Sequence, residues 1–125
     1  VRYGENSRVD FLLDDPTRRA CYLEVKNVHL MRKPGLAEFP DSVTARGAKH
    51  LDALAAVVAA GARAVTLFVI QIPSADRFAA ARDIDPAYGA AFDRARAAGV
   101  EMLAWRCAVT VDGIEIAAPV PIVTA

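Results

Sequence analysis

The stretch that most limits the possible folds is residues 64–72, which read Ala-Val-Thr-Leu-Phe-Val-Ile-Gln-Ile. A near-continuous run of apolar and β-branched residues is typical of a strand that is covered on both faces of its sheet. Helices are predicted on either side of this strand, at 42–60 and 85–99. We therefore expect an α/β fold in which helices pack on a central sheet.

The ends of both predicted helices carry residues that suit helix termini. Asp41 or Ser42 is expected to cap the first helix, and Gly61 is expected to end it. The second helix has Asp85 as its cap, a proline at its first position and Gly99 at its end. These signals define two helices, one before and one after the apolar strand in the sequence.

Alternating or apolar segments predict the remaining strands, at 1–3, 8–13, 21–26, 100–110 and 114–120. Residues 27–41 are expected to form a long loop, and Asp112-Gly113 a tight turn. The resulting order, β-β-β-α-β-α-β-β, describes a mixed central sheet flanked by helices. The whole chain, 1–125, is expected to be one domain.

Composition restricts the partners and the compartment. Basic and acidic residues number 15 each, so a nucleic-acid surface would have to be a local patch. The most apolar window, 53–72, is rich in alanine and interrupted by Gly61 and Arg63, so no membrane span is predicted. Cys21 and Cys107 lie in predicted strands, which favours free thiols and a cytoplasmic protein. The chain starts at Val1, and we expect an N-terminal part to precede it.

The first hairpin brings charged residues together. Pairing its apolar faces sets residues 9, 11 and 13 opposite 25, 23 and 21, and this register places Asp10 opposite Glu24 and Arg8 opposite Lys26. Two opposed carboxylates repel, and a hard cation such as Mg²⁺ removes the conflict. Carboxylates, a cation and a lysine suit phosphodiester hydrolysis. The alternative is a solvated sheet face on which the acids pair with Arg8 and Lys26.

Asp10 and the Glu24-x-Lys26 triplet resemble the signature of PD-(D/E)XK nucleases. The segments YGENSRVDFLL, CYLEVKNVHL, FPDSVTARGAKHLDAL, IDPAY and AGVEMLA, spread over nearly the whole chain, resemble the sugar fermentation stimulation protein A family. The resemblance implies a restriction-endonuclease-like C-terminal domain that follows an N-terminal OB-like domain. It also implies nucleic-acid binding and a role in the regulation of sugar (maltose) metabolism.

The resemblance implies a role for each matching residue. It places Asp10 and Glu24 on a Mg²⁺ (or Mn²⁺) ion and makes Lys26 the catalytic lysine, while the Val25 carbonyl would add a metal ligand. Glu5 matches an acid that some nucleases contribute from an upstream element. One departure is that Val9 stands where the motif's name has proline.

A second group of basic residues lies on the first predicted helix. Arg46, Lys49 and His50 follow the i, i+3, i+4 spacing of one helix face, and with Arg8 they are candidates for phosphate contacts. The alternative is a solvated helix face. DNA is favoured over RNA as the partner, and a homodimer is left open. The sequence thus supports a metal-dependent nuclease or, alternatively, a non-catalytic DNA-binding regulator.

Overall fold

The computed structural model describes residues 2–3, 7–8, 11–15 and 18–124. Within this part, the chain forms a two-stranded sheet, a main sheet of five strands, a second sheet of three strands and two helices. The strands are β1 (Arg2–Tyr3), β2 (Ser7–Arg8), β3 (Phe11–Asp15), β4 (Arg18–Val28), β5 (Leu30–Lys33), β6 (Leu36–Phe39), β7 (Arg63–Ile70), β8 (Arg77–Ala80), β9 (Glu101–Thr110) and β10 (Gly113–Pro119). The helices are α1 (Ala45–Ala59) and α2 (Pro86–Ala97).

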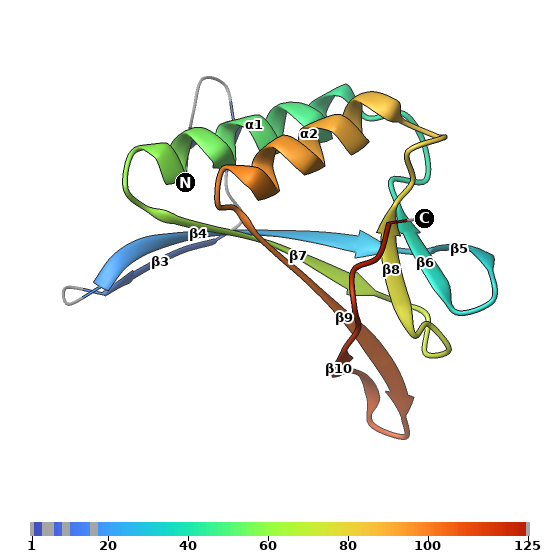
Figure 1. The fold of residues 1–125 in the computed structure, drawn as a ribbon. Coiled ribbons are helices and arrows are strands. Elements are labelled where there is room, and N and C mark those ends of the chain that lie inside the picture. Colours follow the sequence, from blue (N-terminus) through green and yellow to red (C-terminus); the bar gives the residue numbers. More distant parts are fainter. Residues whose placement is uncertain (1, 4–6, 9–10, 16–17, 125) are drawn as a thin grey trace.

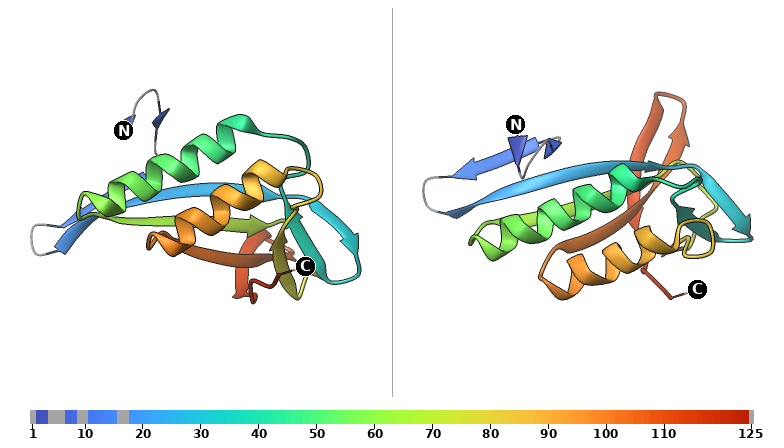
Figure 2. Two further views of the ribbon diagram at one scale, coloured as in Figure 1. Left: turned by 45° about the horizontal axis from the view of Figure 1, so that its top comes forward. Right: turned by 90° about the horizontal axis from the view of Figure 1, so that it is seen from above.

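The main sheet has the strand order β10-β9-β7-β4-β3, with β4, β7 and β9 parallel. The two helices lie side by side over one face of this sheet (Figures 1 and 2). The predicted α/β architecture with a mixed sheet is confirmed, but both helices cover the same face rather than flanking the sheet (Figures 1 and 2). The predicted hairpin register is confirmed where it is described, with Phe11 opposite Leu23 and Leu13 opposite Cys21.

The core lies between the main sheet and the helices. The alternate residues of β7 that face the helices, from Ala64 to Ile70, are at most 1% exposed. Phe68 is central among them, with its ring 4.5 Å from that of Phe78 and 6.0 Å from that of Phe92. Burial of these large rings is a main source of stability, because the hydrophobic contribution scales with the apolar area removed from water.

The prediction of a long loop at 27–41 is wrong. This segment contains the end of β4 and the hairpin β5–β6, whose turn places Gly35 at a φ of 80°. The hairpin pairs with β8 to form the second sheet, and β8 was not predicted. Both errors have one cause: these strands are four residues long and carry charged side chains, which hide the period-two pattern.

The helix termini agree with the predictions at three ends of four. Asp85 caps α2, and Gly61 and Gly99 follow the two helices with positive φ values of 101° and 105°. The cap of α1 is Thr44 rather than Asp41 or Ser42, and its hydroxyl accepts a hydrogen bond from the Gly47 N–H at 3.0 Å. The helix therefore begins three residues later than predicted. Neither helix of the described chain has the length and hydropathy that a membrane span requires.

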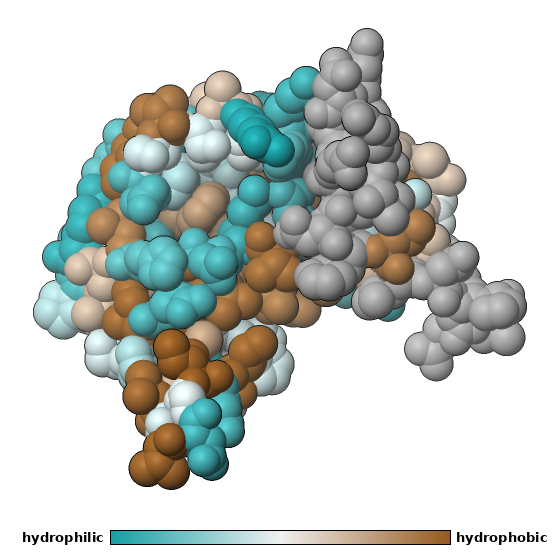
Figure 3. Space-filling view, turned by 180° about the vertical axis from the view of Figure 1, so that it is seen from behind, coloured by the Kyte–Doolittle hydropathy of each residue, from teal (hydrophilic) through white to brown (hydrophobic). Residues whose placement is uncertain are grey.

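The face of the main sheet that points away from the helices is also apolar. Leu23, Val25 and Leu67 are half-buried there, and Leu103 on β9 is 44% exposed. Further apolar side chains are exposed on the β9–β10 hairpin, at the bottom of Figure 3. The sheet is thus apolar on both faces, but only one face is packed under helices.

Candidate functional site

Glu24 lies in the middle of β4, on the face of the main sheet that the helices cover. It is 3% exposed and pairs in register with Thr66 of β7. The alternative of a solvated sheet face is therefore wrong for this carboxylate. An ionised carboxylate in such a position is stable only when it is paired and hydrogen-bonded.

The partners of Glu24 come from its own strand and from α1. The Lys26 Nζ and the His50 Nδ1 both lie 2.8 Å from the same carboxylate oxygen, Oε1. Lys26 is two residues along the strand and therefore points to the same face. Hydrogen bonds that involve ionised groups are stronger than neutral ones, so both contacts help to offset the cost of burying Glu24.

His50 links this carboxylate to the surface of α1. The Arg46 Nε lies 3.5 Å from the His50 Nε2, one helical turn before it. A guanidinium can only donate, so Nε2 accepts this bond and Nδ1 carries the hydrogen that is donated to Glu24. Arg46, His50, Glu24 and Lys26 thus form one continuous hydrogen-bonded chain.

The predicted basic face of α1 is divided in the structure. Arg46 and Lys49 are exposed, but His50 is only 9% exposed and points at Glu24. His50 was predicted to contact nucleic acid with Arg46 and Lys49, but its Nδ1 is directed at Glu24, so Arg46 and Lys49 are the exposed members of this face. Successive i, i+3 and i+4 positions span a wide arc of a helix, and the buried edge of that arc carries His50.

Two buried hydroxyl groups lie next to Glu24. Thr66 and Tyr88 are each 1% exposed, and neither hydroxyl has a hydrogen-bond partner among the described residues. Burial raises the pKa of Tyr88 above its ordinary value, and the charges of Glu24 and Asp85 raise it further. A threonine inside an otherwise apolar strand is a visible sequence signal for this cluster.

Other predicted site residues are placed differently or fall outside the description. Asp10 and Glu5 lie outside the described residues. Arg8 lies in β2, where it pairs with Arg2 of β1, and not opposite Lys26 as predicted. Gly4 and Asn6, residue types that are common in turns, stand between these two strands in the sequence. Val25 follows Glu24 in β4, and within the described ranges no three His, Cys, Asp or Glu side chains gather as a metal-binding group.

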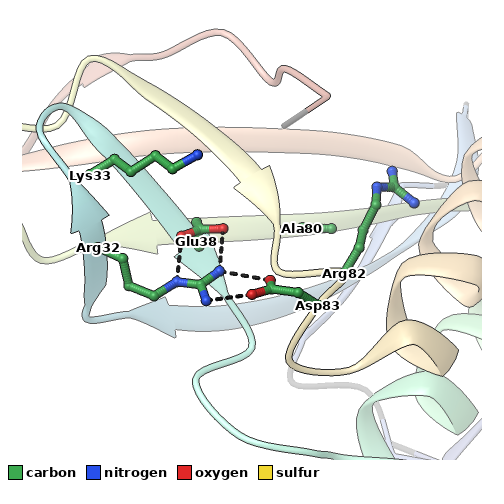
Figure 4. Close-up of a pocket in the computed structure, with 6 residues that line it drawn as sticks. All are labelled: Arg32, Lys33, Glu38, Ala80, Arg82 and Asp83. Carbon is green, nitrogen blue, oxygen red and sulfur yellow. Dashed lines mark hydrogen bonds and ion pairs between the residues drawn. The ribbon is translucent and has the colours of Figure 1, made fainter.

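A second charged cluster lines a pocket of about 390 Å³ between the second sheet and the loop before α2. Figure 4 shows Arg32 between two carboxylates, and its guanidinium donates two bonds each to Glu38 and Asp83 at 2.7–2.9 Å. The arginine lowers the pKa of Asp83 to about 2. All its described polar contacts are internal, so this cluster joins β5 and β6 to the loop before α2.

Comparison with known proteins identifies the family. A family model described as the sugar fermentation stimulation protein RE domain matches residues 1–113. The chain belongs to the sugar fermentation stimulation protein family. This confirms the resemblance seen in the sequence motifs.

Members of the family cover the chain almost completely. The sugar fermentation stimulation protein homologs of Azorhizobium caulinodans and Brucella ovis are each 59% identical to it over 121 residues, 97% of this chain. The chain spans about half (51%) of the length of these relatives. A solved structure of SfsA from Pyrococcus furiosus, in complex with Ca²⁺, matches 98% of this chain and 52% of its own with a TM-score of 0.89 and 27% identity.

Proposed function

We propose that this domain is a Mg²⁺-dependent nuclease-like domain of the PD-(D/E)XK type, which binds DNA and hydrolyses phosphodiester bonds. One observation carries the proposal. Glu24 and Lys26 are neighbours on one face of one strand, and their charged atoms lie 2.8 Å apart. An acid and a lysine at this spacing, at the edge of a buried core, are the residue types that metal-assisted phosphoryl transfer uses.

The chemistry of the donors fits a hard cation. Glu24 and Asp10 would hold it, with the Val25 carbonyl and Glu5 as further oxygen donors, because Mg²⁺ and Mn²⁺ prefer oxygen ligands. The Ca²⁺ in the Pyrococcus furiosus structure supports this choice, since calcium takes the same class of ligand. When bound, the cation would stabilise charge on phosphate oxygens and make a water molecule a better nucleophile.

The chain's own residues have separate roles in this proposal. Lys26 is 21% exposed at its side chain, so its ammonium group is accessible to a phosphate and would offset the negative charge there. Arg46 and Lys49 are exposed on α1 and would contact the phosphate backbone, which positions a nucleic acid without reading its sequence. Arg8 is a further candidate for such a contact.

The alternative is a non-catalytic DNA-binding regulator of sugar metabolism. One observation favours it: Glu24 already receives bonds from both Lys26 and His50. Its charge is therefore compensated by the protein itself, and the fold does not require a cation at this position. In either case, we propose that an N-terminal OB-like domain completes the whole protein and contributes to binding.

The deciding experiment measures cleavage of labelled single- and double-stranded DNA and RNA with Mg²⁺, Mn²⁺ or EDTA. The wild type is expected to cut at least one substrate in a metal-dependent way, and Glu24→Gln and Lys26→Ala are expected to abolish cutting. Lys33→Ala and Glu115→Gln are matched controls on the exposed surface. If the wild type cuts nothing, or if Lys26→Ala cuts as well as the wild type, the regulator becomes the better account.

A further inference from the structure

We infer that His50 is a positioning residue that fixes the Glu24 carboxylate for cation binding. The inference rests on the proposed function and adds a residue from α1 to a site whose described members, Glu24 and Lys26, lie on β4. The supporting observation is the 2.8 Å bond from Nδ1 to Oε1, made between a buried ring and a buried carboxylate.

The carboxylate oxygen that His50 contacts is fully used. A carboxylate oxygen has two in-plane lone pairs, and Oε1 accepts from both His50 and Lys26. Oε1 therefore has no lone pair left for a cation unless one of the two donors is displaced. With both bonds in place, the plane of the carboxylate is set before any cation arrives, and less conformational entropy is lost on binding.

Of the two donors, His50 is the better constrained. Lys26 has a long flexible side chain that is 21% exposed, whereas the imidazole is 11% exposed and attached to a packed helix. Its second nitrogen also accepts from Arg46, which limits rotation of the ring. Of its two described donors, His50 thus restricts the rotation of Glu24 more strongly, and it ties the carboxylate to the position of α1 over the main sheet.

The same geometry argues against His50 as a ligand. Nδ1 donates to Glu24 and Nε2 accepts from Arg46, so both ring nitrogens are committed to protein contacts. Residues that orient a metal ligand in this way typically change affinity by about 10–100-fold when they are removed.

The test is a calorimetric titration of the purified chain with Mn²⁺ and with Mg²⁺, below the melting temperature of every variant. We expect His50→Ala to weaken cation affinity by about 10–100-fold. His50→Asn places an amide N–H near the position of Nδ1 and should recover most of the loss. His50→Gln places its amide near Nε2 and should not. His29→Ala, which removes the exposed histidine after β4, is the matched control and should leave affinity unchanged.

A purely structural role for His50 predicts a different result. All three His50 variants would then melt at lower temperature, but the folded protein would bind the cation as tightly as the wild type. Equal affinity in His50→Ala, or equal rescue by Asn and Gln, overturns the inference while the proposed function stands. A wild type that binds neither cation removes the proposed function and the inference with it.

Discussion

Replacing Glu24 by Gln should destabilise the metal-free domain, because the carboxylate is buried between two donors. Glutamine keeps the shape and one acceptor but removes the negative charge that faces Lys26 and His50. Removing one partner of a buried pair costs about 3–5 kcal/mol. The cost here is smaller, since Lys26 is 21% exposed and can turn towards water. We expect a loss of about 2 kcal/mol, the lower part of the range for hydrogen bonds to charged groups.

Thermal and urea unfolding of the metal-free protein measure this loss. For a domain of this size, about 2 kcal/mol corresponds to a melting temperature lower by roughly 8 °C. Glu101→Gln is the control, because Glu101 pairs with Arg63 at the surface and is 45% exposed. Its loss should be under about 1 kcal/mol. An unchanged or higher melting temperature for Glu24→Gln would refute the reasoning. It would mean that the Glu24 carboxylate is destabilised by a nearby negative charge, as two opposed acids on the hairpin would imply.

Three further predictions concern other parts of the molecule. Thr66→Val and Tyr88→Phe should each raise stability by about 1 kcal/mol in urea unfolding, because each removes a buried hydroxyl with no described partner; a loss would reveal a partner. The pKa of Asp83 is lowered to about 2, so its contribution to stability is present above pH 4 and is lost as the pH falls towards 2. Asp83→Asn should flatten that part of the acid-unfolding curve, and an unaltered curve would contradict the ion pair. Replacing Arg46 and Lys49 by Ala should lower the salt dependence of DNA binding by about 0.9 slope units per lost contact on duplex and about 0.7 on single strands. An identical slope would show that Arg46 and Lys49 do not contact the DNA phosphates and are ordinary solvated surface residues.

The fold was largely predictable from the sequence, because its main signals are local. The apolar run of β7 defines its own strand, and the glycines after both helices mark helix ends within one or two residues of their own positions. The β5–β6 hairpin was not predictable in the same way, although its Pro-Gly turn was visible. Its charged residues, Arg32 and Glu38, interrupt the alternating apolar pattern from which strands are predicted. In the fold they form a hydrogen-bonded ion pair between neighbouring strands of the second sheet.

The candidate site was predicted in its residue types but not in its surroundings. Alternation along β4 shows that Glu24 and Leu23 lie on opposite faces, but it does not show which face the helices cover. The sequence left open whether the polar face holds a cation or meets solvent, whereas in the structure α1 covers Glu24 and Leu23 is half-buried on the other face. The tertiary contact with His50 helps to offset the cost of that burial, and a contact between residues 26 positions apart has no local signal.

The capping carboxylate of α2 also holds the start of α1. Asp85 accepts the Tyr88 N–H of its own helix at 3.0 Å and the Thr44 N–H of the other at 2.7 Å. One side chain therefore sets the axial register of both helices, and α1 cannot slide along the sheet unless α2 moves or this bond breaks. Because His50 lies on α1, the alignment of its ring with Glu24 depends on Asp85, for which the described residues show no hydrogen bond to either of them. Random substitutions that impair the site should therefore include changes at the first turn of α2.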